Sequence, residues 1–375
     1  MRRRHLIQAA LATSALPLSA IAQDSGDIVV AHIGPFTVLP AKDTVWLHEG
    51  FVAAFDEVNA RGGINGRKVR MLKFDDAYSY EGFKARLAEA MSSKPVVLLS
   101  PLGSATLKEV LDTKLLDQYD VTLINAVPGA AVLRNPGHPR LFHIRAGDDE
   151  QIVKIVSHAR SLNIQSMGVL YQNIPIGSSG FASAQDAAKG TSLEVIGVES
   201  KIDDADLAKG AQEIAKRNPH AALVVGNPKF MGQAIAALRA AGVSQQIFAL
   251  SYLPSDVLFK VAGKGARGVG IAQTFPNPQG VTQPLHRAFR AAMQKSHPDL
   301  KGEYTTFNME GYITARVFIE AARRARSITP AGIAEALQRA GEIDLGGFRV
   351  NFSKSNEGSK WVDIGVVTAD GKLRY

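Results

Sequence analysis

The sequence contains no cysteine, and this absence excludes several kinds of chemistry. Without thiols there is no disulfide, no thiolate metal ligand and no cysteine nucleophile. The histidines show no i, i+4 pairing on a helix and no neighbouring carboxylate in a metal-ligand pattern. The G-x-S-x-G nucleophile elbow and the phosphate-binding P-loop are also missing. We therefore expect a protein that is not an enzyme and that holds no metal and no cofactor.

The string Gly263-x-Gly265-x-x-Gly268 matches the dinucleotide-binding fingerprint in letters only. That fingerprint must follow a strand and open a helix, so that the pyrophosphate meets the helix N-terminus. Here the string precedes an apolar, strand-like run. We interpret it as a loop.

The formal net charge is +8, but the basic residues rarely cluster along the sequence. The one cluster is Arg323-Arg324-Ala325-Arg326, which we interpret as the exposed last turn of a helix, where cations complement the helix dipole. No aromatic residues alternate with it and no recognition motif surrounds it. We therefore expect no nucleic-acid partner.

The N-terminus has the layout of an export signal. Arg2-Arg3-Arg4 precedes an apolar run over residues 6–21, and small residues close the run at Ala20 and Ala22. This pattern predicts a signal peptide over residues 1–22, cleaved near Ala22, and a periplasmic protein. Residues 3–7 also fit the core of a twin-arginine signal, but the leading Ser or Thr is absent, so the general secretory route stays equally open.

Beyond residue 27, short apolar runs alternate with longer amphipathic stretches, in two series of similar length. The first series predicts strands at 28–33, 69–74, 96–99 and 121–125, and the second at 167–171, 193–198, 221–225 and 247–250. Helical stretches lie between them, which indicates parallel sheets covered on both faces. We predict an α/β fold of two doubly wound lobes. Residues 348–352 and 361–367 are expected to pair as a hairpin around a turn-rich segment.

In open α/β sheets, ligands bind at the carboxyl ends of the strands. Residues 100–106 form the most informative of these loops, because glycine, hydroxyls and a following helix suit a carboxylate. An equally weighted alternative is that Ser104 or Thr106 only caps that helix. The candidate ligand-binding residues from both series are Phe36, Gly103, Ser104, Thr106, Ala126, Gly129, Gln172, Ile176, Asn227 and Tyr252.

Residues 50–76 carry a family resemblance that extends over essentially the whole chain after the signal. Gly50-x-x-x-Ala54 is followed by the string N-A-R-G-G-I-N-G-R at 59–67 and by Asp75-Asp76 after a strand. This stretch resembles the periplasmic leucine/isoleucine/valine-binding proteins of ABC transporters. The resemblance implies the type I periplasmic-binding fold, with two Rossmann-like lobes joined by three hinge crossovers near 145–147, 272–276 and 360–363. Lobe 1 would then comprise 27–145 with 276–361, and lobe 2 would comprise 146–275 with 362–375.

The resemblance also implies a function and partners. We expect a monomer that captures a small ligand by hinge closure and presents it to a permease in the inner membrane. Family members hold an α-carboxylate with lobe 1 hydroxyls and amides, and an α-ammonium with a lobe 2 acid that falls here at Tyr252. Because residues 251–254 contain no acid, and a buried unpaired ammonium is costly, we favour a non-amino-acid organic or aromatic acid, with an amide as a further option. The alternatives are branched-chain amino-acid binding proper and a periplasmic sensor domain without transport.

Overall fold

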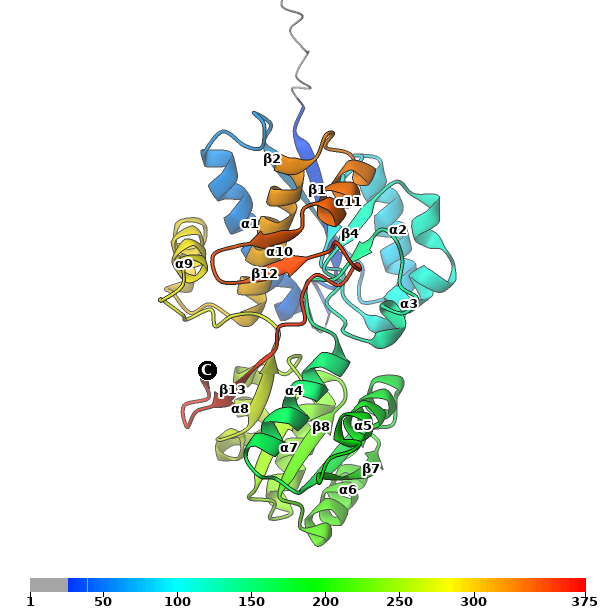
Figure 1. The fold of residues 1–375 in the computed structure, drawn as a ribbon, viewed down its shortest axis with the longest axis vertical. Helices are drawn as coiled ribbons and strands as arrows, with labels where there is room; N and C mark the ends of the chain where they lie inside the picture. Colours follow the sequence, from blue (N-terminus) through cyan, green and yellow to red (C-terminus); the bar gives the residue numbers. More distant parts are fainter. Residues whose placement is uncertain (1–25, 39) are drawn as a thin grey trace, which may run out of the picture.

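The computed structural model describes residues 26–38 and 40–375, so the predicted signal peptide and its cleavage near Ala22 lie outside the described residues. These residues form two α/β lobes stacked along the long axis of the molecule (Figure 1). Lobe 1 is built on a five-stranded sheet and lobe 2 on a seven-stranded sheet. Within the described ranges, no helix is long and apolar enough to cross a membrane.

The lobe 1 sheet is parallel throughout, in the order β2-β1-β3-β4-β5. Its strands are β1 (Ile28–Gly34), β2 (Val69–Asp75), β3 (Val97–Leu99), β4 (Thr122–Ile124) and β5 (Leu141–Phe142). Helices α1 (Ala41–Ala60), α2 (Tyr80–Met91) and α3 (Ser104–Asp112) connect them. Two hydrophobic clusters bury the two faces of this sheet, which explains why its strands are apolar runs rather than alternating ones.

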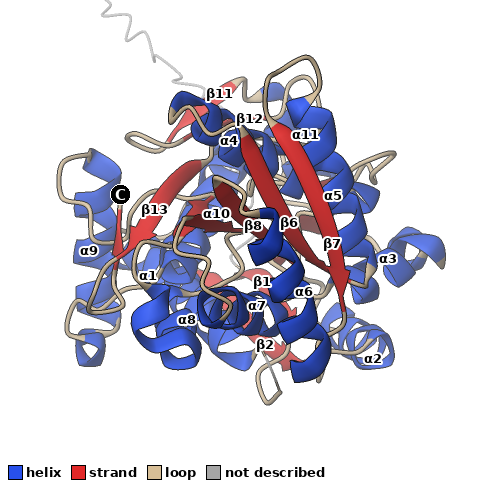
Figure 2. Cartoon of the chain, turned by 90° about the horizontal axis from the view of Figure 1, so that it is seen from below, coloured by secondary structure: helices blue, strands red, loops and turns tan. Residues whose placement is uncertain are grey.

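The lobe 2 sheet has the order β14-β13-β10-β9-β8-β6-β7. Its strands are β6 (Ser166–Gln172), β7 (Glu194–Ser200), β8 (Ala221–Val225), β9 (Gln246–Ala249), β10 (Gly270–Gln273), β13 (Asp363–Val367) and β14 (Leu373–Arg374). Its helices are α4 (Asp148–Ser161), α5 (Pro175–Ala188), α6 (Asp204–Arg217), α7 (Pro228–Ala240) and α8 (Ser255–Ala262). Figure 2 shows α4 and α5 on one side of this sheet and α6, α7 and α8 on the other. The two sheets confirm the predicted doubly wound α/β fold.

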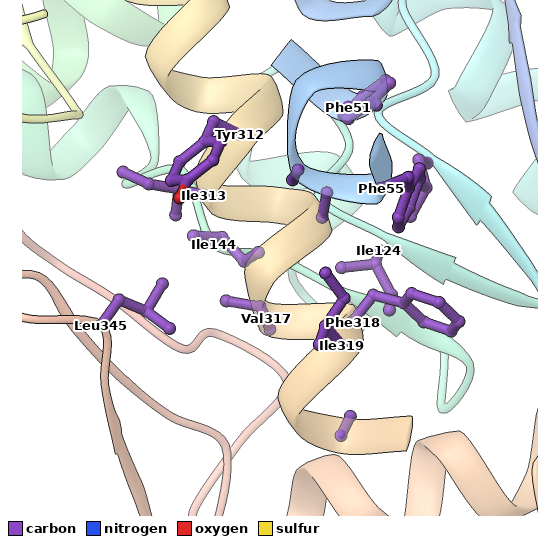
Figure 3. Close-up of a cluster of buried hydrophobic side chains, with 14 of the residues drawn as sticks. Phe51, Phe55, Ile124, Ile144, Tyr312, Ile313, Val317, Phe318, Ile319 and Leu345 are labelled. Atoms are coloured by element: carbon purple, nitrogen blue, oxygen red, sulfur yellow. The ribbon is translucent and has the colours of Figure 1, made fainter. Parts of the chain in front are cut away.

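Lobe 1 is completed by a later part of the chain. Helices α9 (Pro284–Ser296), α10 (Thr306–Arg324) and α11 (Pro330–Arg339) precede a hairpin of β11 (Glu342–Asp344) and β12 (Arg349–Asn351). Helix α10 packs closely on α1 because glycines stand at the contact: a Cβ on Gly50 would lie 2.2 Å from the Asn308 carbonyl oxygen. Figure 3 shows the apolar side of this contact, where Phe55 of α1 meets Phe318 of α10 with ring centroids 6.1 Å apart.

The expected hairpin between residues 348–352 and 361–367 is wrong. Strand β12 pairs with β11 in lobe 1, whereas β13 pairs with β10 and β14 in lobe 2. Both runs alternate as strands should, but the segment between them passes from one lobe to the other instead of turning back. It runs beside the segment after β5, since the His143 amide donates to the Asn356 carbonyl at 2.7 Å and the Gly358 amide donates to the His143 carbonyl at 2.7 Å.

The chain passes between the two sheets three times, after β5, after β10 and after β12. The glycine string at 263–268 lies in a short 3-10 helix (Gly263–Ala266) and the turn that follows it, directly before β10. It therefore has the loop context expected from the sequence.

Candidate ligand site between the lobes

Helix α3 begins beside the lobe interface with an unusual N-terminus. Its N-cap is Gly103, at φ 93°, and no side chain caps the helix. Neither Ser104 nor Thr106 therefore acts as the cap, which removes the alternative that the sequence left open. Ser104 is exposed, while Thr106 is buried. First-turn amides without a cap, at the positive end of a helix dipole, can bind an anionic oxygen.

Phe36 follows β1 at the same edge of the sheet, and its neighbours hold it in place. Its amide donates to an oxygen of Asp75 at 2.9 Å. Its ring meets His32 edge to face at 5.2 Å between centroids, and the Lys73 ammonium lies 4.4 Å from the ring centroid. The ring is half-buried, so one part of it remains available to a ligand.

The loop after β4 joins the two lobes directly. Ala126 is completely buried in the lobe 1 core and offers a ligand no side chain. Gly129 donates its amide proton to the Tyr252 hydroxyl of lobe 2 at 2.6 Å. The same hydroxyl donates to Asp148, in the first turn of α4, at 2.6 Å. The structure thus brings together two predicted site residues, but as partners of each other.

The side-chain oxygens of Gln172 and Asn227 accept hydrogen bonds within lobe 2. The Gln172 side-chain oxygen accepts from the Asn227 amide at 2.9 Å, and Gln172 is 5% exposed. The Asn227 side-chain oxygen accepts from the Phe230 amide at 2.8 Å and caps α7. Ile176 lies half-buried in the first turn of α5. The side-chain oxygens of Gln172 and Asn227 are thus occupied by protein groups, whereas the Ile176 side chain makes no polar contact and can pack against a ligand.

A buried ion pair at the centre of the interface was not predicted from the sequence. Arg145 lies on the first segment between the lobes, and its Nε donates to Glu310 of α10 at 3.0 Å, while its Nη2 donates to the other carboxylate oxygen. Its Nη1 donates to the Ser251 hydroxyl of lobe 2 at 2.6 Å. Arg145 is 3% exposed and Glu310 is 0% exposed.

Polar and aromatic neighbours complete this pair. The Asn125 side chain donates to Glu310 at 3.0 Å and accepts from the Arg145 amide at 2.8 Å. The rings of Tyr252, Phe275 and Phe307 lie 5.3, 5.7 and 5.6 Å from the guanidinium carbon. The signal in the sequence is a single charge inside an apolar stretch, at Arg145 after β5 and at Glu310 within α10.

Two further acids lie near the interface. Burial raises the pKa of Asp43, in the first turn of α1, to about 7; Asp256 and Glu310 raise it further, while Arg145 lowers it. Burial also raises the pKa of Asp148, against the lowering effect of the Tyr252 hydrogen bond. Acidic groups are therefore present at the interface, although residues 251–254 supply none.

A separate surface hollow of about 430 Å³ lies where α10 ends against α11. Its rim includes Arg324 and Arg339, which pair with Glu320 and Glu335 at 3.7 and 2.8 Å. The arginine cluster thus lies at the end of α10, as expected from the sequence, and apart from the loops between the lobes.

Comparison with known proteins identifies relatives along nearly the whole chain. A family model described as periplasmic binding protein matches residues 27–372. The Leu/Ile/Val-binding protein of Escherichia coli (strain K12) is 21% identical over 281 residues, which is 74% of this chain and 75% of that protein. The crystal structure of an extracellular ligand-binding receptor from Verminephrobacter eiseniae is 45% identical, with a TM-score of 0.88 over 93% of this chain and 100% of the other. A substrate-binding periplasmic protein from Ralstonia solanacearum is 25% identical, with a TM-score of 0.80 over 93% and 99%.

Proposed function

The chain belongs to the periplasmic binding protein family, and from this premise we propose that it is the substrate-binding protein of a branched-chain-amino-acid-type ABC transporter. The family is one of binding proteins, which confirms that the chain is not an enzyme. The observation that carries the proposal is the direct contact of loops from both lobes, through Gly129 with Tyr252 and Arg145 with Ser251. A ligand held between such loops would stabilise closure, and closure would present a surface to the permease in the inner membrane.

Three crossings of the chain serve as the hinge in this proposal. We place lobe 1 at 27–145 with 276–361 and lobe 2 at 146–275 with 362–375. The paired backbone at His143 and residues 356–358 supports a hinge in which two crossings move together. Only these three short segments are proposed to join the lobes. Such a linkage favours rotation of the two lobes as rigid bodies about the joining segments. We place the protein in the periplasm, exported by the signal within residues 1–22.

A carboxylate group is the ligand feature that the interface supports best. The uncapped first turn of α3 offers backbone amides, and the exposed Ser104 offers a hydroxyl. Phe36 and Ile176 would contact the rest of the ligand from lobe 1 and lobe 2. Tyr252 stands at the position where family members carry the acid that holds an ammonium, and its hydroxyl donates to Asp148. We therefore favour an organic or aromatic acid without an amine.

A second candidate is amino-acid binding proper, and Asp43 is the observation that favours it. Its carboxylate comes from lobe 1 and makes no hydrogen bond or ion pair with another described residue. An ammonium beside it would supply the missing partner of a poorly solvated acid. The two candidates differ in one chemical group of the ligand.

A thermal unfolding screen with matched ligand pairs tests the proposal. Each pair shares a side chain and differs in the amine, as in L-leucine against 4-methylpentanoate and L-phenylalanine against 3-phenylpropanoate, with the corresponding primary amides as a third arm. A ligand at a hundred times its Kd adds about 2.7 kcal/mol of stability. We expect at least one carboxylate to raise the melting temperature and its amide not to. A folded protein that no carboxylate stabilises would overturn the proposal.

A further inference from the structure

We propose that Tyr252 is a positioning residue rather than a ligand contact: its hydroxyl, with the neighbouring Ser251, latches lobe 2 to lobe 1 through protein groups alone. The proposal goes beyond the function proposed above and does not need a ligand. Its basis is the hydrogen bonding of residues from three separate parts of the chain, at 125–148, 251–252 and 310.

The Tyr252 hydroxyl has no proton left for a ligand. It has a single proton, which it donates to Asp148 at 2.6 Å. It accepts from the Gly129 amide at 2.6 Å, and the Gly129 carbonyl in turn accepts from the Asp148 amide at 3.0 Å. The two bonds made by Gly129 join lobe 1 to lobe 2, and the bond between Tyr252 and Asp148 closes the ring within lobe 2. A ligand carboxylate would find neither the hydroxyl proton nor the Gly129 proton free.

The glycine at 129 is required by this ring. A Cβ at that position would lie 2.3 Å from a carboxylate oxygen of Asp148 and 2.6 Å from the Tyr252 hydroxyl. Both distances are far below a normal contact, so any side chain would push the two lobes apart. Because Gly129 is not among the glycines with positive φ, alanine is excluded here by these contacts and not by backbone conformation.

Ser251 makes the second half of the latch. Its hydroxyl accepts from Arg145 at 2.6 Å, which crosses between the lobes, and its amide donates to Gln151 of α4 at 2.9 Å, which fixes Ser251 within lobe 2. Arg145 is fixed from the lobe 1 side by its two hydrogen bonds to Glu310. Two consecutive lobe 2 residues thus hydrogen-bond to two different lobe 1 groups. Tyr252 accepts from the Gly129 backbone amide, and Ser251 accepts from the buried Arg145 guanidinium.

The latch affects how much of the closing free energy the ligand must supply. If protein contacts already favour the closed arrangement, the ligand binds a state that is largely populated beforehand. An apparent Kd equals the intrinsic Kd divided by the fraction of competent molecules, so loss of the latch weakens binding without touching the ligand. Release to a permease would then require that the latch be broken.

Pulsed electron paramagnetic resonance on the ligand-free protein tests the latch. Because the sequence has no cysteine, cysteines introduced by Glu109→Cys in lobe 1 and Ala182→Cys in lobe 2 are the only labelled sites. Both positions are exposed. In this labelled background, Tyr252→Phe and Gly129→Ala should shift the population from the short inter-lobe distance toward longer ones. Loss of one hydrogen bond predicts a change in the open-to-closed ratio of roughly fivefold or more.

The control is Tyr171→Phe, which removes a tyrosine hydroxyl on β6 that bonds to no other described residue. It should leave the distance distribution of the parent unchanged. Distances in Tyr252→Phe and Gly129→Ala that equal those of the parent would overturn the proposal, whether or not their melting temperatures fall. If the ligand screen yields a stabilising acid, Tyr252→Phe should bind it more weakly, by a factor no greater than the roughly fivefold change in the open-to-closed ratio, and should recover the short distance at saturation. A screen without any ligand would count against the proposed function and leave the distance test intact.

Discussion

Arg145 and Glu310 form the most deeply buried charge pair described at the lobe interface, with side chains 3% and 0% exposed. Removing one partner of such a pair leaves the other charge uncompensated, which usually costs about 3–5 kcal/mol. We expect Glu310→Gln to lower the free energy of unfolding by about 3 kcal/mol, measured by urea denaturation. Glutamine keeps one side-chain oxygen that can still accept from the Asn125 amide, so the loss falls on the pairing with Arg145.

An exposed pair supplies the control for that experiment. Glu335 and Arg339 lie 2.8 Å apart on α11 with exposed side chains. Such pairs contribute about 1 kcal/mol or less. Glu335→Gln should therefore have a small effect, and equal losses in the two variants would contradict the role given to the buried pair.

Asp43 predicts a pH dependence of stability. Its pKa is about 7 in the folded protein against 3.8 ordinarily, and burial is the main cause. A raised acid pKa means that ionisation is costlier in the folded state than in the unfolded state. Below pH 4 both states are protonated and no penalty applies, whereas the penalty grows through pH 4–7 and is complete above 7. Asp43→Asn should therefore gain stability relative to the parent as the pH rises through this window.

The same residue separates the two ligand candidates. Binding of an ammonium beside Asp43 favours the ionised carboxylate, so an amino acid should release protons on binding at pH 6.5, whereas a simple acid should not. Calorimetric titration in two buffers of different ionisation enthalpy measures this release. Release that persists in Asp43→Asn would show that another group is responsible.

At the scale of elements, the start of α3 allows the contribution of a side chain to ligand binding to be measured separately from its contribution to stability. Ser104 is exposed and does not cap its helix, so Ser104→Ala should leave stability within about 0.5 kcal/mol. It should weaken binding of the acid found in the screen by roughly fivefold, the worth of one hydrogen bond. Titration calorimetry and thermal unfolding of the same sample measure both quantities.

Ser79 provides the opposite case. Its hydroxyl accepts from the Gly82 amide at 3.1 Å and caps α2. Ser79→Ala should cost about 1 kcal/mol of stability and leave affinity unchanged. If Ser104→Ala behaved in the same way, the α3 terminus would be a structural feature and not part of the ligand site.

Most elements were predictable because their apolar periodicity is a local property of the chain. Strand β1 and helix α1 follow directly from their buried runs. The pairing of β12 and β13 was not predictable, because alternation identifies a strand but not its partner, and these two strands belong to different lobes. Sheet membership depends on contacts made far along the chain.

At the scale of the whole molecule, the two-lobed architecture was predictable from the two α/β series together with the family string at 59–67. The candidate site was located only at the level of loops. Tyr252 was identified, but its partners Gly129 and Asp148 lie more than a hundred residues away in sequence. Arg145 and Glu310 were missed because a charge in an apolar run gives no sign of the opposite charge that it will meet after folding.

In the proposed function, the molecule captures one small carboxylate between its lobes. Mass spectrometry of the small molecules released by denaturing protein purified from its native host tests it most directly. We predict one low-mass species bearing a carboxylate, near one equivalent per chain, that also stabilises the emptied protein when added back. A nucleotide, or no species that restores stability, would show that the molecule does not capture a small carboxylate.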